Sequence, residues 1–252
     1  MEHAIDLFAA PTDLSVLDAL HISVHRGMRA VAVTLAATPA RRAATNDALR
    51  TYWSGVAEQL RTLMQVEAAL HAALADRSPR SRAAISRANA NHATIEGLIS
   101  ELNEAFVELA STGCNQAAIE RAASLDRAVA DHLDAANRDL RWALQRTLDV
   151  VEHQRIFKEV LQGHRSAFAG PFVAAWVAPS HWDRVRGHRL FGRPGRLAQR
   201  RHARLVSRAL GEHRRAVMDE RFDPPVLPAT PQPTSAGATS IWPTEEVFDA
   251  TA

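Results

Sequence analysis

A carboxylate interrupts a hydrophobic series within residues 46–76. Apolar side chains recur there at steps of three or four residues, and the step between Leu63 and Leu70 falls on Glu67. The full apolar series is Leu49, Trp53, Val56, Leu60, Leu63, Leu70 and Leu74. Burying an unpaired carboxylate is costly, so such a group is usually neutralised, paired with a cation or bound to a metal ion. The chemistry of Glu67 therefore depends on the side chains that face it.

Histidines fall on the apolar faces of three other long segments. His92 and His132 each take a place in the apolar series of their segment, and His21 or His25 does so in the first. Three imidazoles and a carboxylate can bind Zn, Fe or Mn. The chain has 12 histidines, and a single inward histidine is more often a hydrogen-bonded core residue than a metal ligand. Convergence from four segments nevertheless predicts a metal site formed by His25, Glu67, His92 and His132.

The positions of these residues along the helix axes can be compared from their distances to the connecting turns. At a rise of about 1.5 Å per residue, Glu67, His92 and His132 agree in level to within about 3 to 5 Å. His25 fits this level less well than His21. Both histidines therefore remain candidates for the ligand from the first segment.

Four amphipathic helices must hold these side chains. Helical spacing of apolar residues predicts helices over residues 13–37, 46–76, 79–111 and from 115 to beyond 148. Pro39, Ser78-Pro79 and Thr112-Gly113 separate the helices, and Asn46 is a capping residue for the second. Long helices with short connections favour an all-α fold, an antiparallel up-down-up-down four-helix bundle over residues 12–151.

The composition changes after the fourth helix. We expect residues 152–218 to form a short, basic helical extension. We expect residues 219–252 to be a disordered tail, because they are rich in Pro, Ser and Thr. The arginines from Arg184 to Arg208 suggest an acidic protein, a nucleic acid or an anionic surface as a partner. The simpler alternative is a solvated extension that packs its tryptophans on the bundle.

Other sequence features limit the functional classes. The 252 residues contain one cysteine, which excludes an internal disulfide framework and suits a reducing compartment. We find no signal peptide and no apolar run of the roughly 18 residues that a membrane helix needs, so we expect a cytoplasmic protein without a transmembrane segment. No nucleophile elbow, glycine-rich phosphate loop or zinc-finger cysteine pair occurs.

Four segments carry a resemblance to a known family. They are HRGMRAVAVTL from His25, YWSGVAEQLRTLMQVEAALHAAL from Tyr52, NHATIEGLISELNEAF from Asn91 and DHLDAANRDL from Asp131. The sequence resembles the hemerythrin-like (HHE cation-binding) domain, of the actinobacterial type with an arginine-rich C-terminal extension. The resemblance covers roughly residues 14–151. It implies a four-helix bundle with a non-haem di-iron centre that binds oxygen or a related small ligand.

The family's ligand set is incomplete in this chain. The resemblance matches His25, Glu67, His92 and His132 to family ligands. Family histidines or acids are replaced at Leu63, Ala88, and Ala136 or Asn137. A di-iron centre needs two bridging carboxylates and enough nitrogen ligands for both ions. These departures predict one non-haem iron at most.

Three functions follow from this reading. The first is a metal-binding protein with a degenerate site that senses oxygen, nitric oxide or redox state. The second is a metal-free bundle, in which Glu67 pairs with a protonated histidine and the arginine-rich extension acts as an interaction scaffold. The third is a di-iron oxidase or peroxidase, which the missing ligands disfavour, so we do not expect an enzyme.

Overall fold

The computed structural model describes residues 14–44, 46–163, 169–176 and 196–219. These residues are helical and include no strand, which confirms the all-α class. The described residues all belong to one compact unit. The predicted helix start at Asp13 and the predicted disordered tail lie outside the described residues.

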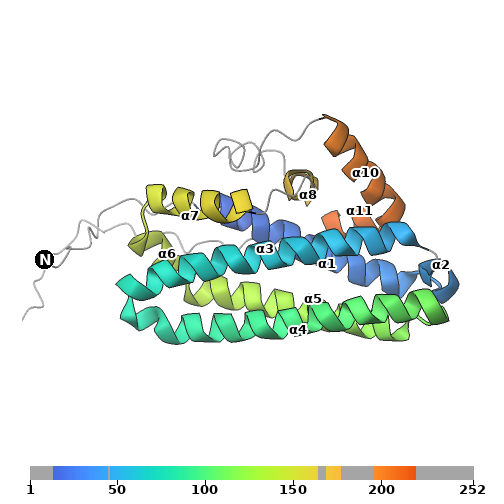
Figure 1. The fold of residues 1–252 in the computed structure, drawn as a ribbon, viewed down its shortest axis with the longest axis horizontal. Helices are drawn as coiled ribbons and strands as arrows, with labels where there is room; N and C mark the ends of the chain where they lie inside the picture. The colour runs from blue at the N-terminus through green and yellow to red at the C-terminus, as the bar shows by residue number, and fades with distance from the viewer. Residues whose placement is uncertain (1–13, 45, 164–168, 177–195, 220–252) are drawn as a thin grey trace, which may run out of the picture. The chain divides into compact units, whose positions relative to one another are not determined.

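Four long helices form the central part of this unit (Figure 1). They are α1 (Ser15–Ala37), α3 (Asp47–Arg77), α4 (Arg82–Thr112) and α5 (Gln116–Asp139). Helix α1 packs against α3 and α5, and α4 packs against the same two helices. Each apolar face is therefore buried against two neighbours, as expected for amphipathic helices in a soluble protein. Within the described ranges, every helix is too short or too polar to cross a membrane.

The boundaries of the two central helices follow their local sequence. The side chain of Asn46 accepts a hydrogen bond of 3.0 Å from the backbone N–H of Leu49 at the start of α3. Pro79 opens a 3-10 turn, η1 (Pro79–Ser81), directly before α4. Gly113 ends α4 with a φ of 72°, a left-handed conformation that glycine adopts without a steric penalty. These capping signals were predicted correctly.

The predicted fourth helix is correct as far as Asp139 but wrong in continuing unbroken beyond Leu148. Helix α5 ends at Asp139, and a separate helix α6 (Arg141–Thr147) follows after Leu140. The guanidinium of Arg141 pairs with Asp18 of α1, and α6 packs against α3. Leu140, Leu144 and Leu148 are all buried. The apolar spacing therefore continues across the break, which explains why periodicity alone does not reveal it.

The C-terminal extension covers α1 and α3. Helix α7 (Val150–Gly163) packs against α3, and α8 (Ala169–Trp176) packs against α1. Helix α10 (Arg196–Leu210) also packs against α3, and α11 (His213–Asp219) packs against α1. Gly211 lies between these last two helices with a φ of 53°. A short helix, α2 (Ala40–Ala44), occupies the predicted break after α1.

Two aromatic side chains of α8 anchor this extension. Phe172 and Trp176 are both fully buried. The indole N–H of Trp176 donates a hydrogen bond of 3.0 Å to the hydroxyl of Tyr52 on α3. A buried hydroxyl and a buried indole thereby satisfy each other, so the extension shares one hydrophobic core with the long helices.

Candidate metal centre

Glu67 lies in the middle of α3 and is only 3% exposed. The buried side chains of Leu63 and Leu70 flank it along the same helix. A carboxylate does occupy the hydrophobic interior, as the spacing of the apolar residues predicted. The cost of burying it must be offset by the groups that surround its two oxygens.

Three imidazoles converge on this carboxylate. The Nε2 atom of His132 lies 2.9 Å from Oε2 of Glu67, and Nε2 of His92 lies 3.0 Å from the same oxygen. The Nε2 atom of His21 lies 3.0 Å from Oε1. His21, His92 and His132 come from α1, α4 and α5 respectively. Each of the four long helices thus contributes one side chain to a single cluster, which we call the Glu67 cluster.

Helix α1 contributes His21 to this cluster. The three hydrogen bonds that the described residues make to the Glu67 carboxylate come from His21, His92 and His132. His25 lies one turn further along α1 and is partly exposed. Of the two candidates on α1, His21 and not His25 is the one that contacts the Glu67 carboxylate. The reason is the level along the axis, since one helical turn moves a side chain by about 5.4 Å.

The Glu67 carboxyl group is ionised at neutral pH. Burial by itself raises its pKa, but hydrogen bonds from His132, His21 and His92 lower the pKa more, to well below the ordinary value. An ionised carboxylate only accepts hydrogen bonds, so each Nε2 atom carries the proton in this arrangement. The Nδ1 atoms of His21 and His132 are buried and have no hydrogen-bond partner among the described residues.

Sequence analysis missed His71. It lies one turn after Glu67 on α3, is 2% exposed, and its ring stacks on that of His92 with centroids 6.1 Å apart. Burial lowers the pKa of His71 to about 4, although the charge of Glu67 opposes this, so the ring is neutral at pH 7. The signal was present in the sequence, because a spacing of four residues puts His71 and Glu67 on one face of a helix.

The donor set fits one metal ion. Glu67, His92 and His132 each offer a ligand atom, and these atoms lie within 4.8 Å of one another. Two ligand atoms about 2.1 Å from one ion are about 3.4 Å apart in a tetrahedral site. The distances of 2.9 and 3.0 Å from Oε2 of Glu67 are ordinary hydrogen-bond lengths, so the two imidazoles would need to move only by about 0.5 Å to share an ion with the carboxylate. Binding would move the proton of each coordinating imidazole from Nε2 to Nδ1.

The imidazoles of the Glu67 cluster lack some of the hydrogen bonds that ligating histidines usually make through their second nitrogen. A ligating imidazole normally donates its second N–H to a carboxylate, a carbonyl or a water. The unpaired Nδ1 atom of His132 lacks such a partner in the described part of the chain. A cavity of about 10 Å³ beside Glu67, His21 and His71 is near the minimum that one water needs. Asn137 lines this cavity from the end of α5.

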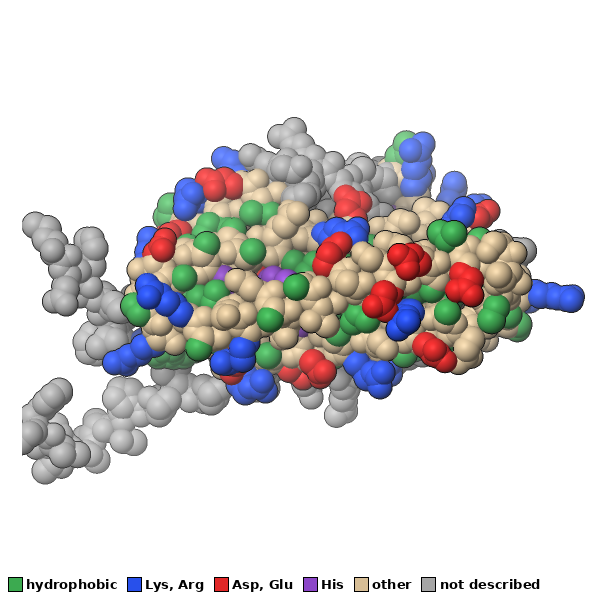
Figure 2. Space-filling view, turned by 60° about the horizontal axis from the view of Figure 1, so that its bottom comes forward, with side chains coloured by type: hydrophobic (Ala, Val, Ile, Leu, Met, Phe, Trp, Pro, Cys, Tyr) green, Lys and Arg blue, Asp and Glu red, His purple; other side chains and the backbone are tan. Residues whose placement is uncertain are grey.

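The cluster is close to the molecular surface on one side. The side chain of His92 is 12% exposed, whereas those of Glu67 and His132 are 3% exposed. Histidine side chains are visible on the face of the molecule drawn in Figure 2. A small solute or a metal ion therefore has a short path to the imidazole of His92.

The assignment of this cluster depends on its geometry. It combines a buried carboxylate with three imidazoles from three other helices. Buried ion-pair networks can bring the same residue types together without a metal. The donor set therefore shows a cluster that is able to bind a metal ion. No protein-family model matches this chain, and neither the curated proteins nor the solved structures contain a match.

Proposed function

We propose that this protein binds one metal ion through Glu67, His92 and His132, with His21 as a fourth ligand. The observation that carries the proposal is the approach of three Nε2 atoms to within 3.0 Å of one buried carboxylate. A carboxylate could be neutralised more simply by one arginine. A divalent ion would explain why three imidazoles from different helices meet there.

The proposed metal is non-haem iron. Imidazole suits Zn, Cu, Fe and Ni, and two histidines with one carboxylate form the ligand set of many non-haem Fe(II) proteins. The resemblance to hemerythrin-like proteins also favours iron. A ferrous ion with an open coordination position would supply reversible binding of oxygen, nitric oxide or a similar small ligand. We propose sensing of such a ligand, or of redox state, as the biological role.

We also propose that α1, α3, α4 and α5 form an antiparallel up-down-up-down bundle of the hemerythrin-like type. Two ligand positions of that family carry no imidazole or acid here, since one is the buried Leu63 and the other is Ala136 or Asn137. The remaining donors surround a single carboxylate, so the proposal is limited to one ion.

Elemental analysis tests this proposal directly. The protein is purified without chelator or affinity tag, stripped of metal, and then titrated anaerobically with Fe(II) and in parallel with Zn(II). We expect about one ion per chain, in agreement with a single four-ligand site. A content below about 0.1 ion per chain under saturating conditions contradicts the proposal, since four buried donors would then hold no metal.

A second candidate function is the binding of an anionic partner by α10. This helix contains five arginines and no acidic residue. Arg200, Arg201, Arg204 and Arg208 are exposed. The rest of the predicted basic segment, from Arg184 to residue 195, lies outside the described residues. A gel shift with duplex DNA over a range of salt tests this candidate, because phosphate contacts weaken steeply as salt rises. An unshifted band at low salt removes nucleic acid as the partner.

A further inference from the structure

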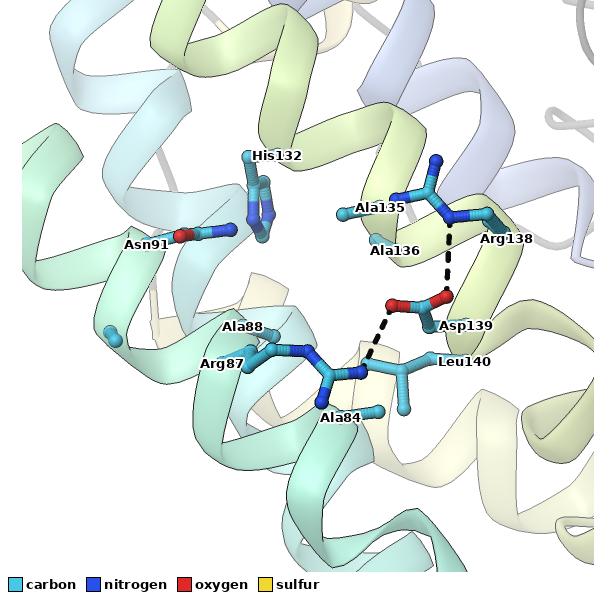
Figure 3. Close-up of a pocket in the computed structure, with 11 residues that line it drawn as sticks. Ala84, Arg87, Ala88, Asn91, His132, Ala135, Ala136, Arg138, Asp139 and Leu140 are labelled. Atoms are coloured by element: carbon cyan, nitrogen blue, oxygen red, sulfur yellow. Dashed lines mark hydrogen bonds and ion pairs between the residues drawn. The ribbon is translucent and has the colours of Figure 1, made fainter.

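A second, larger cavity opens between α4 and α5 (Figure 3). Its volume is about 290 Å³. We call it the α4–α5 pocket. It begins at the imidazole of His132 and extends past Asn91 to the charged side chains of Arg87, Asp139 and Arg138. This pocket is separate from the small cavity beside His21 and His71, although Ala136 and Leu140 line both.

The walls of the pocket are apolar and lined by small side chains. Ala84 and Ala88 line it from α4, and Ala135 and Ala136 line it from α5. A water occupies about 30 Å³ in the liquid, so the volume suits a ligand of roughly ten non-hydrogen atoms. Oxygen or nitric oxide would fill only a small part of it. The size therefore points to a small organic molecule with an apolar body.

One end of the pocket is positively charged. The guanidinium of Arg87 lies 3.2 Å from Oδ2 of Asp139, and Nε of Arg138 lies 3.3 Å from Oδ1 of the same carboxylate. Two cations thus share one anion. The side chains of Arg87 and Arg138 are 64% and 71% exposed, so both can reorient toward a ligand. A carboxylate is a planar anion that a guanidinium ion can bind through two parallel hydrogen bonds.

The opposite end is polar and buried. His132 is 2% exposed, and its Nδ1 atom has no hydrogen-bond partner among the described residues. The amide of Asn91 points toward His132 in Figure 3. We infer that the α4–α5 pocket binds a small organic monocarboxylate, with its carboxylate on Arg87 and Arg138 and its body between the alanines, directed at His132. This inference rests on the proposed function only in one respect, that the inner end of the ligand would lie beside the metal ion.

Benzoate is a suitable probe, because its nine non-hydrogen atoms match the volume and it carries one carboxylate. Its binding is measured by ligand-observed NMR titration, with benzylamine as a cationic analogue of nearly equal size. For a ligand of this size we expect a dissociation constant of about 1 mM. Benzylamine should bind at least about tenfold more weakly, because it meets two guanidinium groups. Equal binding of both compounds, or no benzoate binding at about 10 mM, overturns the inference.

Charge variants sharpen the test. Arg87→Gln and Arg138→Gln should each weaken benzoate binding by about two- to fivefold, as is usual for exposed ion pairs. Asp139→Asn should strengthen it by a similar factor, because the competing internal carboxylate is gone. Arg127→Gln is the matched control, since Arg127 is an exposed arginine of α5 that does not line the pocket. A loss of binding in Asp139→Asn, or an equal loss in Arg127→Gln, contradicts the inference.

A cavity-filling variant gives an independent readout. Ala88→Leu places three further carbon atoms in the pocket and should abolish benzoate binding, provided thermal unfolding shows that the fold is intact. If this variant does not fold, the outcome with Asp139→Asn decides. Titrations are repeated on metal-free and zinc-loaded protein. Benzoate binding to metal-free protein that takes up no zinc supports the pocket while contradicting the proposed metal site, so the two failures are distinguishable.

Discussion

The Nε2 atom of His132 and the Oε2 atom of Glu67 lie 2.9 Å apart, and the two side chains are each only 3% exposed. The two residues are 65 positions apart in the chain, on α5 and α3. This contact joins two helices through a charged group whose other close neighbours include His21 and His92. It is the contact on which the proposed metal centre depends most directly.

Glu67→Gln should reduce both metal content and stability. The amide keeps the shape of the side chain but removes the charge and turns one acceptor into a donor that faces an imidazole N–H. We expect metal content to fall at least about tenfold. The metal-free protein should lose about 2 to 4 kcal/mol of unfolding free energy, because buried N–H groups lose an acceptor. Both are measured on one preparation, by elemental analysis and by urea unfolding.

Glu58→Gln is the matched control for that experiment. Glu58 is an exposed residue of the same helix. Its replacement should change the unfolding free energy by no more than about 0.5 kcal/mol and leave metal content unchanged. If Glu67→Gln behaved like Glu58→Gln, the buried carboxylate would have no structural or metal-binding role.

His21 and His25 offer a comparison within one helix. His21→Gln removes an imidazole that lies 3.0 Å from Oε1 of Glu67, so metal affinity should fall by about 10- to 100-fold. His25→Gln should leave metal affinity within about threefold of the wild type, because it keeps all three imidazoles of the Glu67 cluster. Competition titration with a chromophoric zinc chelator measures both constants. The reverse order of effects would assign the ligand from α1 to His25.

His202 should make stability depend on pH. Burial, and then the charge of Arg214, lower the pKa of His202 to about 4. Its ordinary pKa is about 6.5, so the unfolded chain takes up this proton first as pH falls. The folded state should therefore lose up to about 2 kcal/mol from this group between pH 6.5 and pH 5. His202→Leu should remove this contribution to the pH dependence of the unfolding free energy, measured by urea unfolding of metal-free protein. The reference is pH 7.5, at which His202 is neutral in the folded state and almost entirely neutral in the unfolded chain. An unchanged slope in the variant would contradict the buried position of His202.

Gly27 and Gly97 test the contact between α8 and α1. A Cβ atom added at Gly27 would lie 2.6 Å from Cζ of the buried Phe172, whereas one added at Gly97 would meet nothing within 4 Å. Gly97→Ala should stabilise the protein by up to about 1 kcal/mol through helix propensity. Gly27→Ala gains the same propensity but overpacks the ring, so we expect a net loss of about 1 kcal/mol. Chemical unfolding of the two variants gives the comparison. Stabilisation by both would indicate that Phe172 does not rest on Gly27.

Several features of the site follow from local spacing. Glu67, His92 and His132 fall on apolar faces of their helices, and each of these placements needs only the helical period of 3.6 residues. The same period, applied to His71, places it on the face of Glu67. The spacing of four residues between Glu67 and His71 was therefore enough to predict that His71 lies beside the site.

Other features could not be read from spacing. His21 and His25 differ by one helical turn and lie on nearly the same face. Counting residues to the turns favoured the level of His21 but left both open, and the relative level of α1 and α3 in the fold decides which one reaches Glu67. The break at Leu140 leaves the apolar series intact, and therefore periodicity is blind to it. The burial of Phe172 and Trp176 depends on the packing of α8 against α1, which is distant in the sequence.

Local periodicity was enough to predict that the described residues are helical, where their main caps lie, and that one acid and several histidines face inward, since each of these depends on neighbours within about one turn. The partners of Glu67, the apolar walls of the α4–α5 pocket and the covering of α1 and α3 by later helices depend on residues far apart in the chain. Their arrangement follows from how helices slide and rotate against one another during packing, which short-range spacing does not specify.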